Sequence, residues 1–166
     1  MLLADLTATE ALAREVVARS RPGDLLVVTG PLGSGKTTLT QAIARQLGST
    51  AVVTSPTYTL VHEYPTPHGT LVHVDAYRLS DAADVQRLGL EDYLERARLT
   101  VVEWGEGLLR AHPDALWLEL GFHDDQGRAG SDAGELTGQG IGRTARWREP
   151  PGSTANGWPP SHEGHA

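Results

Sequence analysis

The sequence contains no cysteine, and this absence removes several kinds of chemistry from consideration. Without thiols there is no disulfide framework, no thiolate metal site and no cysteine nucleophile. No apolar run approaches the roughly 18 residues that a membrane-spanning helix needs, so we expect no membrane association. The N-terminus also lacks a basic stretch ahead of an apolar one, and we therefore expect no secretion signal and a cytoplasmic protein.

Basic residues are scarce as well. Asp and Glu outnumber Lys and Arg by 21 to 14, which gives a formal net charge of -7. This balance argues against a broad basic surface for nucleic acid, so any nucleic acid would have to be held mainly by another protein. The seven histidines are scattered without metal-ligand spacing, and we interpret them as surface or tail residues.

The only lysine of the chain, Lys36, lies in the segment GPLGSGKTT at residues 30–38, which fits the pattern G-x-x-x-x-G-K-[ST]. Glycines let a backbone approach an anion closely, and the N–H groups at the start of a helix then point at it. In this pattern Lys36 is expected to reach the β- and γ-phosphates of a nucleotide, while the Thr37 hydroxyl binds Mg²⁺. The segment therefore predicts a phosphate-binding loop.

The residues around this loop have the pattern that the motif requires. The β-branched run at 24–29 predicts a buried strand before the loop, and 38–47 predicts a helix after it. We further expect an edge strand at 2–6 and a helix from a capping box at 7–10 to about 19. A loop followed by a strand is expected at 52–64, strands at 70–75, 99–103 and 115–120, and short helices at 81–87 and 91–98. The strand within 52–64 is close enough to the strand at 70–75 to pair antiparallel. We expect an α/β protein with a P-loop NTPase-like three-layer fold and a mixed parallel/antiparallel central sheet.

The chain is long enough for one domain, and we place that domain at residues 1–123. From Asp124 to Ala166, glycine, proline, serine and charged residues replace the periodic apolar pattern. A segment of this composition buries too little surface to offset its ordering entropy, so we predict a disordered tail. The alternative is that Arg143, Arg146, Trp147 and Arg148 form an adhesive patch.

Two predicted strands end in an acidic residue, namely Asp75 and Glu103. In P-loop enzymes an acid at the carboxyl end of a strand near the loop contacts Mg²⁺ or its waters. One of the two can serve the metal while the other orients the attacking water, and the residues alone leave this division open. The hydroxyls of Thr57 and Thr59 are either a sensor for the γ-phosphate or an ordinary start of a strand.

Together these segments resemble the TsaE family, which are bacterial P-loop ATPases of tRNA threonylcarbamoyladenosine biosynthesis. The resemblance rests on segments 30–38, 55–64 (SPTYTLVHEY), 73–79 (HVDAYRL), 88–93 (LGLEDY) and 102–104 (VEW), in the family's order, and covers roughly residues 3–120. Only the phosphate loop is generic, and the other four segments are specific in combination. The chain departs from the family at Gly105, where proline is frequent, and this difference concerns turn geometry.

The resemblance implies an ATPase that acts with TsaD and TsaB homologues and contacts tRNA only through them. It implies that ATP and Mg²⁺ are the cofactors, that Glu103 joins Thr37 in Mg²⁺ coordination, and that Asp75 positions the hydrolytic water, with Asp75 and Lys36 as the catalytic pair. The nucleotide would contact Gly30, Leu32, Gly33, Ser34, Gly35, Lys36, Thr37, Thr38 and Trp104. Whether the nearby Arg78 acts in catalysis stays open.

Three other functions share the phosphate loop. A small-molecule or nucleotide kinase usually carries an arginine-rich lid, and no such arginine cluster occurs in the predicted core. A GTPase needs a second lysine to read guanine, and the chain has none. A module that binds ATP without turnover stays open, because the sequence does not distinguish slow hydrolysis from none.

Overall fold

The computed structural model describes residues 1–55, 60–78, 88–123, 129–130 and 142–152. The predictions for Thr57, Thr59, the helix at 81–87 and the Arg78 side chain fall outside these residues, as does most of the predicted disordered tail.

A single mixed sheet organises the molecule, with strand order β1-β8-β6-β2-β5-β4-β3 and β7 beside β6. Its strands are β1 Leu2–Leu3, β2 Leu25–Thr29, β3 Val61–Thr66, β4 Gly69–Asp75, β5 Ala97–Glu103, β6 Leu116–His123, β7 Ala129–Gly130 and β8 Gly142–Arg148. The four central strands β6, β2, β5 and β4 run parallel, and the flanking strands pair antiparallel. The predicted mixed sheet is thus confirmed, including the antiparallel pair β3–β4.

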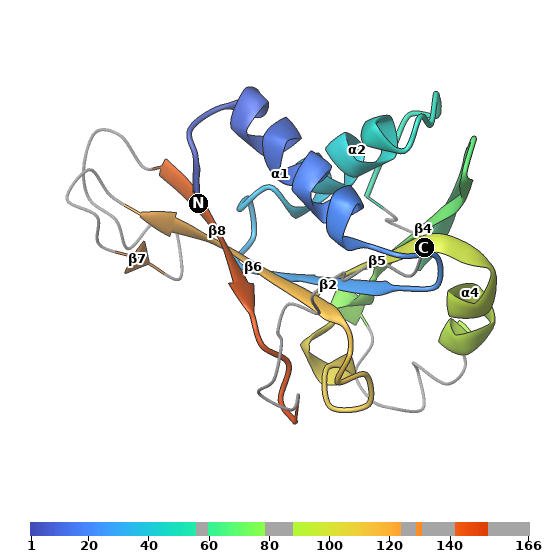
Figure 1. Ribbon diagram of the computed structural model, residues 1–166. Helices are drawn as coiled ribbons and strands as arrows, with labels where there is room; N and C mark the ends of the chain where they lie inside the picture. The colour runs from blue at the N-terminus through green and yellow to red at the C-terminus, as the bar shows by residue number, and fades with distance from the viewer. Residues whose placement is uncertain (56–59, 79–87, 124–128, 131–141, 153–166) are drawn as a thin grey trace, which may run out of the picture.

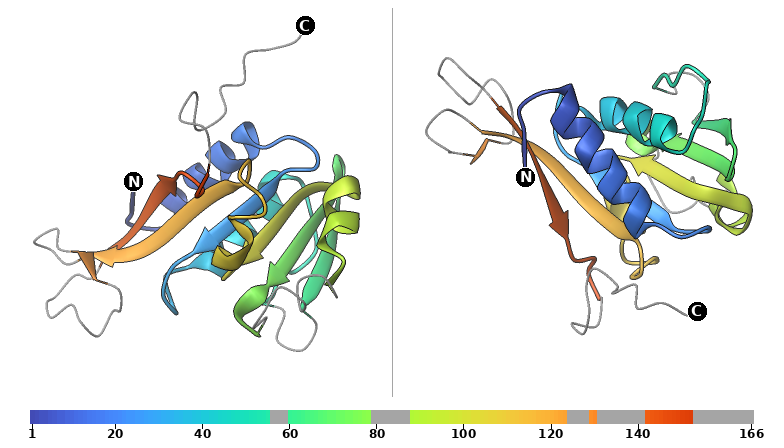
Figure 2. Two further views of the ribbon diagram at one scale, coloured as in Figure 1. Left: turned by 90° about the horizontal axis from the view of Figure 1, so that it is seen from below. Right: turned by 45° about the horizontal axis from the view of Figure 1, so that its top comes forward.

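Helices cover both faces of this sheet (Figures 1 and 2). Helices α1 (Leu6–Arg19) and α2 (Lys36–Gln46) lie side by side on one face, where Leu12, Val16, Leu39 and Ile43 are fully buried against it. On the other face pack α4 (Leu90–Arg96) and the short 3₁₀ helix η2 (Glu106–Leu108), and a second 3₁₀ turn, η1 (Ala76–Arg78), follows β4. The two apolar layers confirm the three-layer prediction. No helix in the described part of the chain is both long and apolar enough to cross a membrane.

The first helix begins two residues earlier than the capping-box pattern predicts. Asp5 is its N-cap, and its Oδ1 accepts a hydrogen bond of 2.8 Å from the Ala8 backbone N–H. Aspartate is at least as favourable an N-cap as threonine. Thr7 lies within the first turn.

Strand β8 corrects the predicted domain boundary. Residues Gly142–Arg148 pair with β6 on one side and β1 on the other, so the prediction of a disordered segment over 124–166 is wrong for these residues. The side chain of Trp147 packs against α1, its Nε1 donates a hydrogen bond of 2.9 Å to Glu15, and the Arg19 guanidinium lies 5.0 Å from the ring centre. The arginine and tryptophan patch is therefore a strand of the core sheet.

The docking of β8 predicts a loss of stability in Trp147→Ala. The substitution removes packing against α1 and the bond to Glu15, so the free energy of unfolding should fall by about 1–3 kcal/mol in urea denaturation. Arg146→Ala is the matched control, because Arg146 is exposed on the same strand, and it should change stability by less than about 0.5 kcal/mol. Equal stability of both variants and the parent would contradict the docking of β8.

Candidate active site

The loop between β2 and α2 has the backbone that its glycines predict. Gly30, Gly33 and Gly35 have φ angles of 134°, 78° and 101°, a region that favours glycine. Gly30 also lies so close to the Leu120 carbonyl oxygen that an added Cβ would collide with it. Strand β2 is buried throughout, and α2 begins at Lys36, so the loop is fixed at both ends.

The Lys36 side chain lies folded into this loop, and only 5% of it is exposed. Its Nζ donates hydrogen bonds to the carbonyl oxygens of Gly30 (2.7 Å) and Pro31 (2.9 Å) and lies 3.8 Å from the centre of the Trp104 ring. Burial lowers the pKa of Lys36 below its ordinary value, although the nearby charge of Glu103 works in the opposite direction. Among the described residues Lys36 has no ion pair with a carboxylate, so the loop holds a cation that is paired only with carbonyls.

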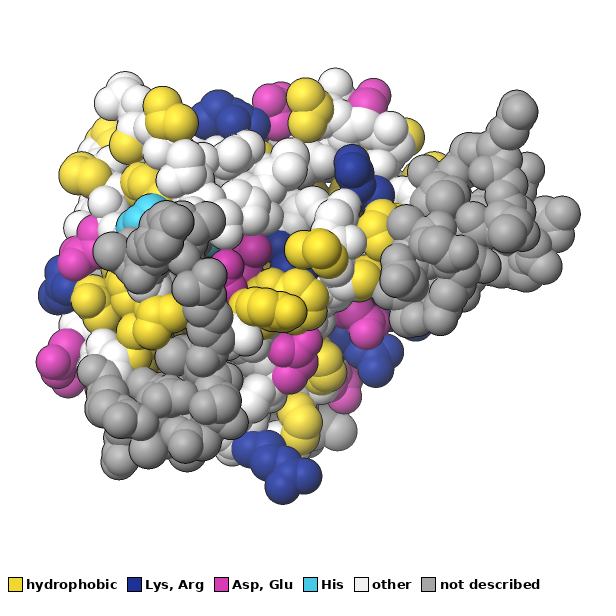
Figure 3. Space-filling model, turned by 180° about the vertical axis from the view of Figure 1, so that it is seen from behind, with side chains coloured by type: hydrophobic (Ala, Val, Ile, Leu, Met, Phe, Trp, Pro, Cys, Tyr) yellow, Lys and Arg dark blue, Asp and Glu magenta, His cyan; other side chains and the backbone are white. Residues whose placement is uncertain are grey.

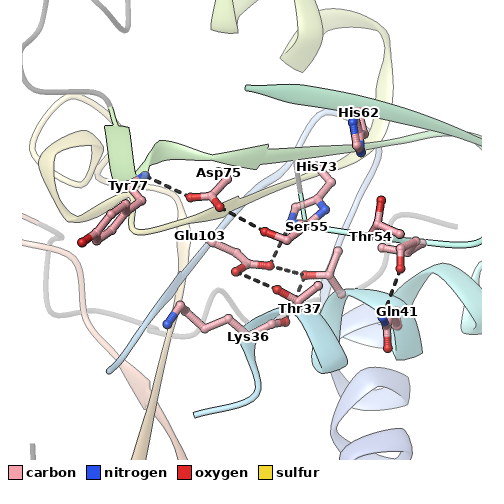
Figure 4. Close-up of polar contacts among 12 residues, drawn as sticks. Lys36, Thr37, Gln41, Thr54, Ser55, His62, His73, Asp75, Tyr77 and Glu103 are labelled. Atoms are coloured by element: carbon pink, nitrogen blue, oxygen red, sulfur yellow. Dashed lines mark hydrogen bonds and ion pairs between the residues drawn. The ribbon is translucent and has the colours of Figure 1, made fainter. Parts of the chain in front are cut away.

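Glu103, the last residue of β5, is buried at the centre of a polar network (Figure 4). Its Oε2 accepts a hydrogen bond from the Thr37 hydroxyl (3.2 Å), and its Oε1 accepts one from His73 Nε2 (2.8 Å). The Thr40 hydroxyl lies 3.5 Å from Oε1 and 3.1 Å from the Lys36 carbonyl oxygen, and it can donate to either. An ionised carboxylate is only an acceptor, so His73 donates through Nε2. The network fixes the Glu103 carboxylate beside Thr37.

His73 corrects the interpretation of the histidines as surface residues. It is fully buried in β4, and its partner Glu103 is on the neighbouring strand. The sequence does not show whether a histidine within a strand faces a helix or solvent, so His73 was not predicted to be buried. Its position in the apolar run LVHVD was nevertheless a usable signal. A buried carboxylate needs such a donor, because burial without hydrogen bonds is costly.

Asp75 ends β4 next to Glu103, and the register of β4 and β5 pairs the two residues directly. Its Oδ2 accepts a hydrogen bond from Ser55 (3.2 Å), and its Oδ1 accepts one from the backbone N–H of Tyr77 (3.1 Å). The two predicted acids thus meet at one edge of the sheet. Sequence reasoning did not single out Ser55 or Tyr77, although both belong to segments that it used.

A cavity of about 320 Å³ brings the predicted residues together. Those that line it are Leu32, Gly33, Gly35, Lys36, Thr37, Thr38, Asp75, Glu103 and Trp104. Two residues of the predicted set do not line it: the Gly30 carbonyl accepts a hydrogen bond from Lys36, and Ser34 lines a neighbouring cavity. Arg143 of β8 also lines the first cavity, and sequence reasoning missed this because it placed that residue in a disordered tail.

The rim of this cavity is aromatic. The rings of Tyr77 and Trp104 meet edge to face with centres 5.1 Å apart, and Trp104 adopts a positive φ of 61°, which is uncommon outside glycine. This backbone turns the indole back over Lys36 directly after β5 ends. The site therefore combines glycine backbone, one buried cation, two carboxylates and oxygen atoms of the kind that Mg²⁺ prefers.

The parallel core strands and the glycine loop leading into α2 define a P-loop α/β protein. Comparison with known families narrows this class. The model of the family described as "Threonylcarbamoyl adenosine biosynthesis protein TsaE" matches residues 3–129. The chain therefore belongs to the TsaE family.

Relatives and a solved structure agree with this assignment. The tRNA threonylcarbamoyladenosine biosynthesis protein TsaE of Bacillus subtilis is 37% identical over 134 residues, which is 81% of this chain and 80% of the relative. The protein of the same name from Streptomyces coelicolor is 37% identical over 139 residues, or 82% and 91% of the two chains. The crystal structure of Bacillus subtilis YdiB has a TM-score of 0.63 at 28% identity, covering 91% of this chain and 84% of that one.

The buried pair of His73 and Glu103 predicts a specific loss of stability. His73→Ala leaves a buried carboxylate oxygen without its shortest hydrogen bond, and the free energy of unfolding should fall by about 1–3 kcal/mol. His73→Gln is the matched control, because its amide can still donate, and it should lose clearly less in the same urea titration. Equal losses in the two variants would show that the hydrogen bond to Glu103 contributes nothing.

Proposed function

We propose that this protein is the ATP-binding and ATP-hydrolysing component of the machinery that makes threonylcarbamoyladenosine in tRNA, and that its hydrolysis cycle resets a complex of TsaB and TsaD homologues. Membership of the TsaE family supports the pathway. One observation supports the proposed ATP hydrolysis: the side chains of Lys36, Thr37 and Glu103 line one cavity beside the phosphate loop.

Each side chain has a role in this proposal. The loop backbone and Lys36 bind the phosphates of ATP, and the Lys36 ammonium exchanges its two carbonyl partners for phosphate oxygens. Charge-assisted bonds to phosphate are stronger than bonds to neutral carbonyls, which favours this exchange. Trp104 covers Lys36 and reduces its access to water, so the electrostatic attraction between the lysine and the phosphates is strengthened.

The metal would be held by Thr37 and Glu103, whose oxygen atoms are 3.2 Å apart. Mg²⁺ keeps several waters and takes few protein ligands beside phosphate, so this sparse donor set fits it. When bound, the ion neutralises charge on the phosphates. Thr40 and His73 would keep Glu103 in place, as residues behind a metal ligand commonly do.

Asp75 would orient the water that attacks the γ-phosphate. It lies in the same cavity as Lys36, and it has hydrogen-bond donors on both oxygens, from Ser55 and Tyr77. These contacts fix the carboxylate without burying it completely. A carboxylate held in this way accepts a proton from water at a fixed place, which is the contribution that orientation makes to hydrolysis.

Partners would complete this site and hold the tRNA. On the face shown in Figure 3 the basic side chains are scattered among acidic and hydrophobic ones, which agrees with the net charge of -7. The exposed side chains of Leu32 and Tyr77 stand at the mouth of the cavity, where a partner can cover them. Arginines supplied by a partner are worth about 10³–10⁵ in rate in other P-loop enzymes.

The proposal is tested by steady-state phosphate release with and without TsaB and TsaD homologues. The isolated protein should hydrolyse ATP very slowly, and the partners should raise the rate well above the sum of the separate components. Lys36→Ala should abolish the stimulated rate, whereas Arg45→Ala, an exposed position on the same helix α2, should retain it. An unchanged rate with partners, or transfer of the phosphate to an acceptor other than water, would contradict the proposal.

A further inference from the structure

The Ser55 hydroxyl, which donates a hydrogen bond of 3.2 Å to Asp75 Oδ2, belongs to a segment without regular secondary structure (Figure 4). Among the described residues, the backbone of 53–55 makes no hydrogen bond to another backbone group. Within this part of the chain, the position of the segment therefore depends on side chains from neighbouring elements.

Two side chains hold this backbone, one from α2 and one from β3. Gln41 of α2 donates a hydrogen bond of 3.0 Å from Nε2 to the Val53 carbonyl oxygen. Tyr64 of β3 places its hydroxyl oxygen 3.3 Å from both the backbone nitrogen and the carbonyl oxygen of Thr54. Both polar backbone groups of Thr54 are thus held, one residue before Ser55.

The Tyr64 ring is itself fixed in the protein. Only 6% of Tyr64 is exposed, and its ring belongs to the apolar layer between the sheet and helices α1 and α2. A buried tyrosine hydroxyl needs a hydrogen-bond partner, and the Thr54 backbone supplies one. Tyr64 does not line the cavity that contains Asp75. Any influence of its hydroxyl on Asp75 therefore passes through the segment to which it binds.

The Tyr64 hydroxyl has one proton and three polar neighbours, so their roles can be assigned. The Thr54 N–H donates to the hydroxyl oxygen, and the Thr54 carbonyl oxygen accepts the hydroxyl proton. The third neighbour, His62 Nδ1, lies 3.0 Å from the hydroxyl oxygen, and the two rings meet edge to face. All three contacts are satisfied together when His62 donates from Nδ1. His62 then directs the hydroxyl proton towards Thr54.

We propose that Tyr64 is a positioning residue for ATP hydrolysis, which holds Thr54 so that Ser55 keeps the Asp75 carboxylate directed at the attacking water. This inference rests on the proposed function, since it concerns how the acid of that function is oriented. Small displacements of a reacting group lower enzyme rates strongly, so a contact outside the cavity can still affect hydrolysis.

The test compares Tyr64→Phe with the parent in single-turnover ATP hydrolysis, with TsaB and TsaD homologues present. The substitution keeps the buried ring and removes the hydroxyl, so the rate should fall about three- to tenfold, the range expected for one neutral hydrogen bond. ATP affinity in a calorimetric titration should be unchanged, because Tyr64 does not line the cavity. Tyr93→Phe is the matched control and should behave like the parent, because Tyr93 lies in α4 on the opposite face of the sheet.

A double-mutant cycle separates positioning from a general loss of structure. Ser55→Ala removes the donor to Asp75 and should lower the same rate by a similar factor. If Tyr64 acts through Ser55, Tyr64→Phe should change the rate little further in the Ser55→Ala background. Two effects that multiply independently would show that the Tyr64 hydroxyl does not act through Ser55, and would overturn the inference.

Amide hydrogen exchange tests the contact with Thr54 without reference to activity. Exchange at the Thr54 N–H should be about three- to tenfold faster in Tyr64→Phe, because its acceptor is lost, and unchanged in Tyr93→Phe. Unchanged exchange in Tyr64→Phe would show that the hydroxyl does not hold the segment.

The outcomes separate this inference from the proposed function. If the partners stimulate hydrolysis by the parent and Tyr64→Phe hydrolyses ATP at the parent's rate, the positioning role is overturned and the proposed function stands. If the partners do not stimulate the parent, the proposed function fails and the positioning role fails with it.

Discussion

The parallel pairing of β2 with β5 is the constraint on which the whole site depends. Its register sets Val28, two residues before the loop begins, opposite Glu103. The loop and the carboxylate therefore leave neighbouring strands at the same edge of the sheet, and the first turn of α2 returns Thr37 to within 3.2 Å of Glu103. Parallel strands end side by side, so this arrangement follows from topology and not from a flexible loop. A shift of one residue would turn Glu103 to the opposite face.

This arrangement requires ionisable groups to be buried in a small protein. Glu103 is 2% exposed and Lys36 is 5% exposed, and each is stabilised by several hydrogen bonds rather than by direct pairing with the other. Burying a charge with donors or acceptors already in place is costly for folding but reduces the reorganisation needed when a ligand arrives. His73 is one of these donors. It is fully buried and binds the Glu103 carboxylate, but it does not line the cavity.

The fold and the loop could be predicted from sequence because their signals are local. The glycines, Lys36 and the β-branched run before them lie within a dozen residues, and the acids Asp75 and Glu103 end recognisable apolar runs. Strand β8 could not be predicted, since only Ala145 and Trp147 are apolar in Gly142–Arg148 and one of its two partners, β1, lies at the other end of the chain. Periodicity does not report such pairing. Because β8 was not predicted, the position of Arg143 beside Gly35 could not be predicted either.

In the proposed function one acid binds the metal and the other orients the attacking water, and the dependence of ATP affinity on Mg²⁺ distinguishes the two roles. Glu103→Gln and Asp75→Asn keep the shapes of the two side chains and remove their charges. ATP affinity should become nearly independent of Mg²⁺ in Glu103→Gln but keep the parent's dependence in Asp75→Asn, because only the first change alters the proposed metal contact. Equal loss of the Mg²⁺ dependence in both variants, or its retention in both, would contradict the division of roles.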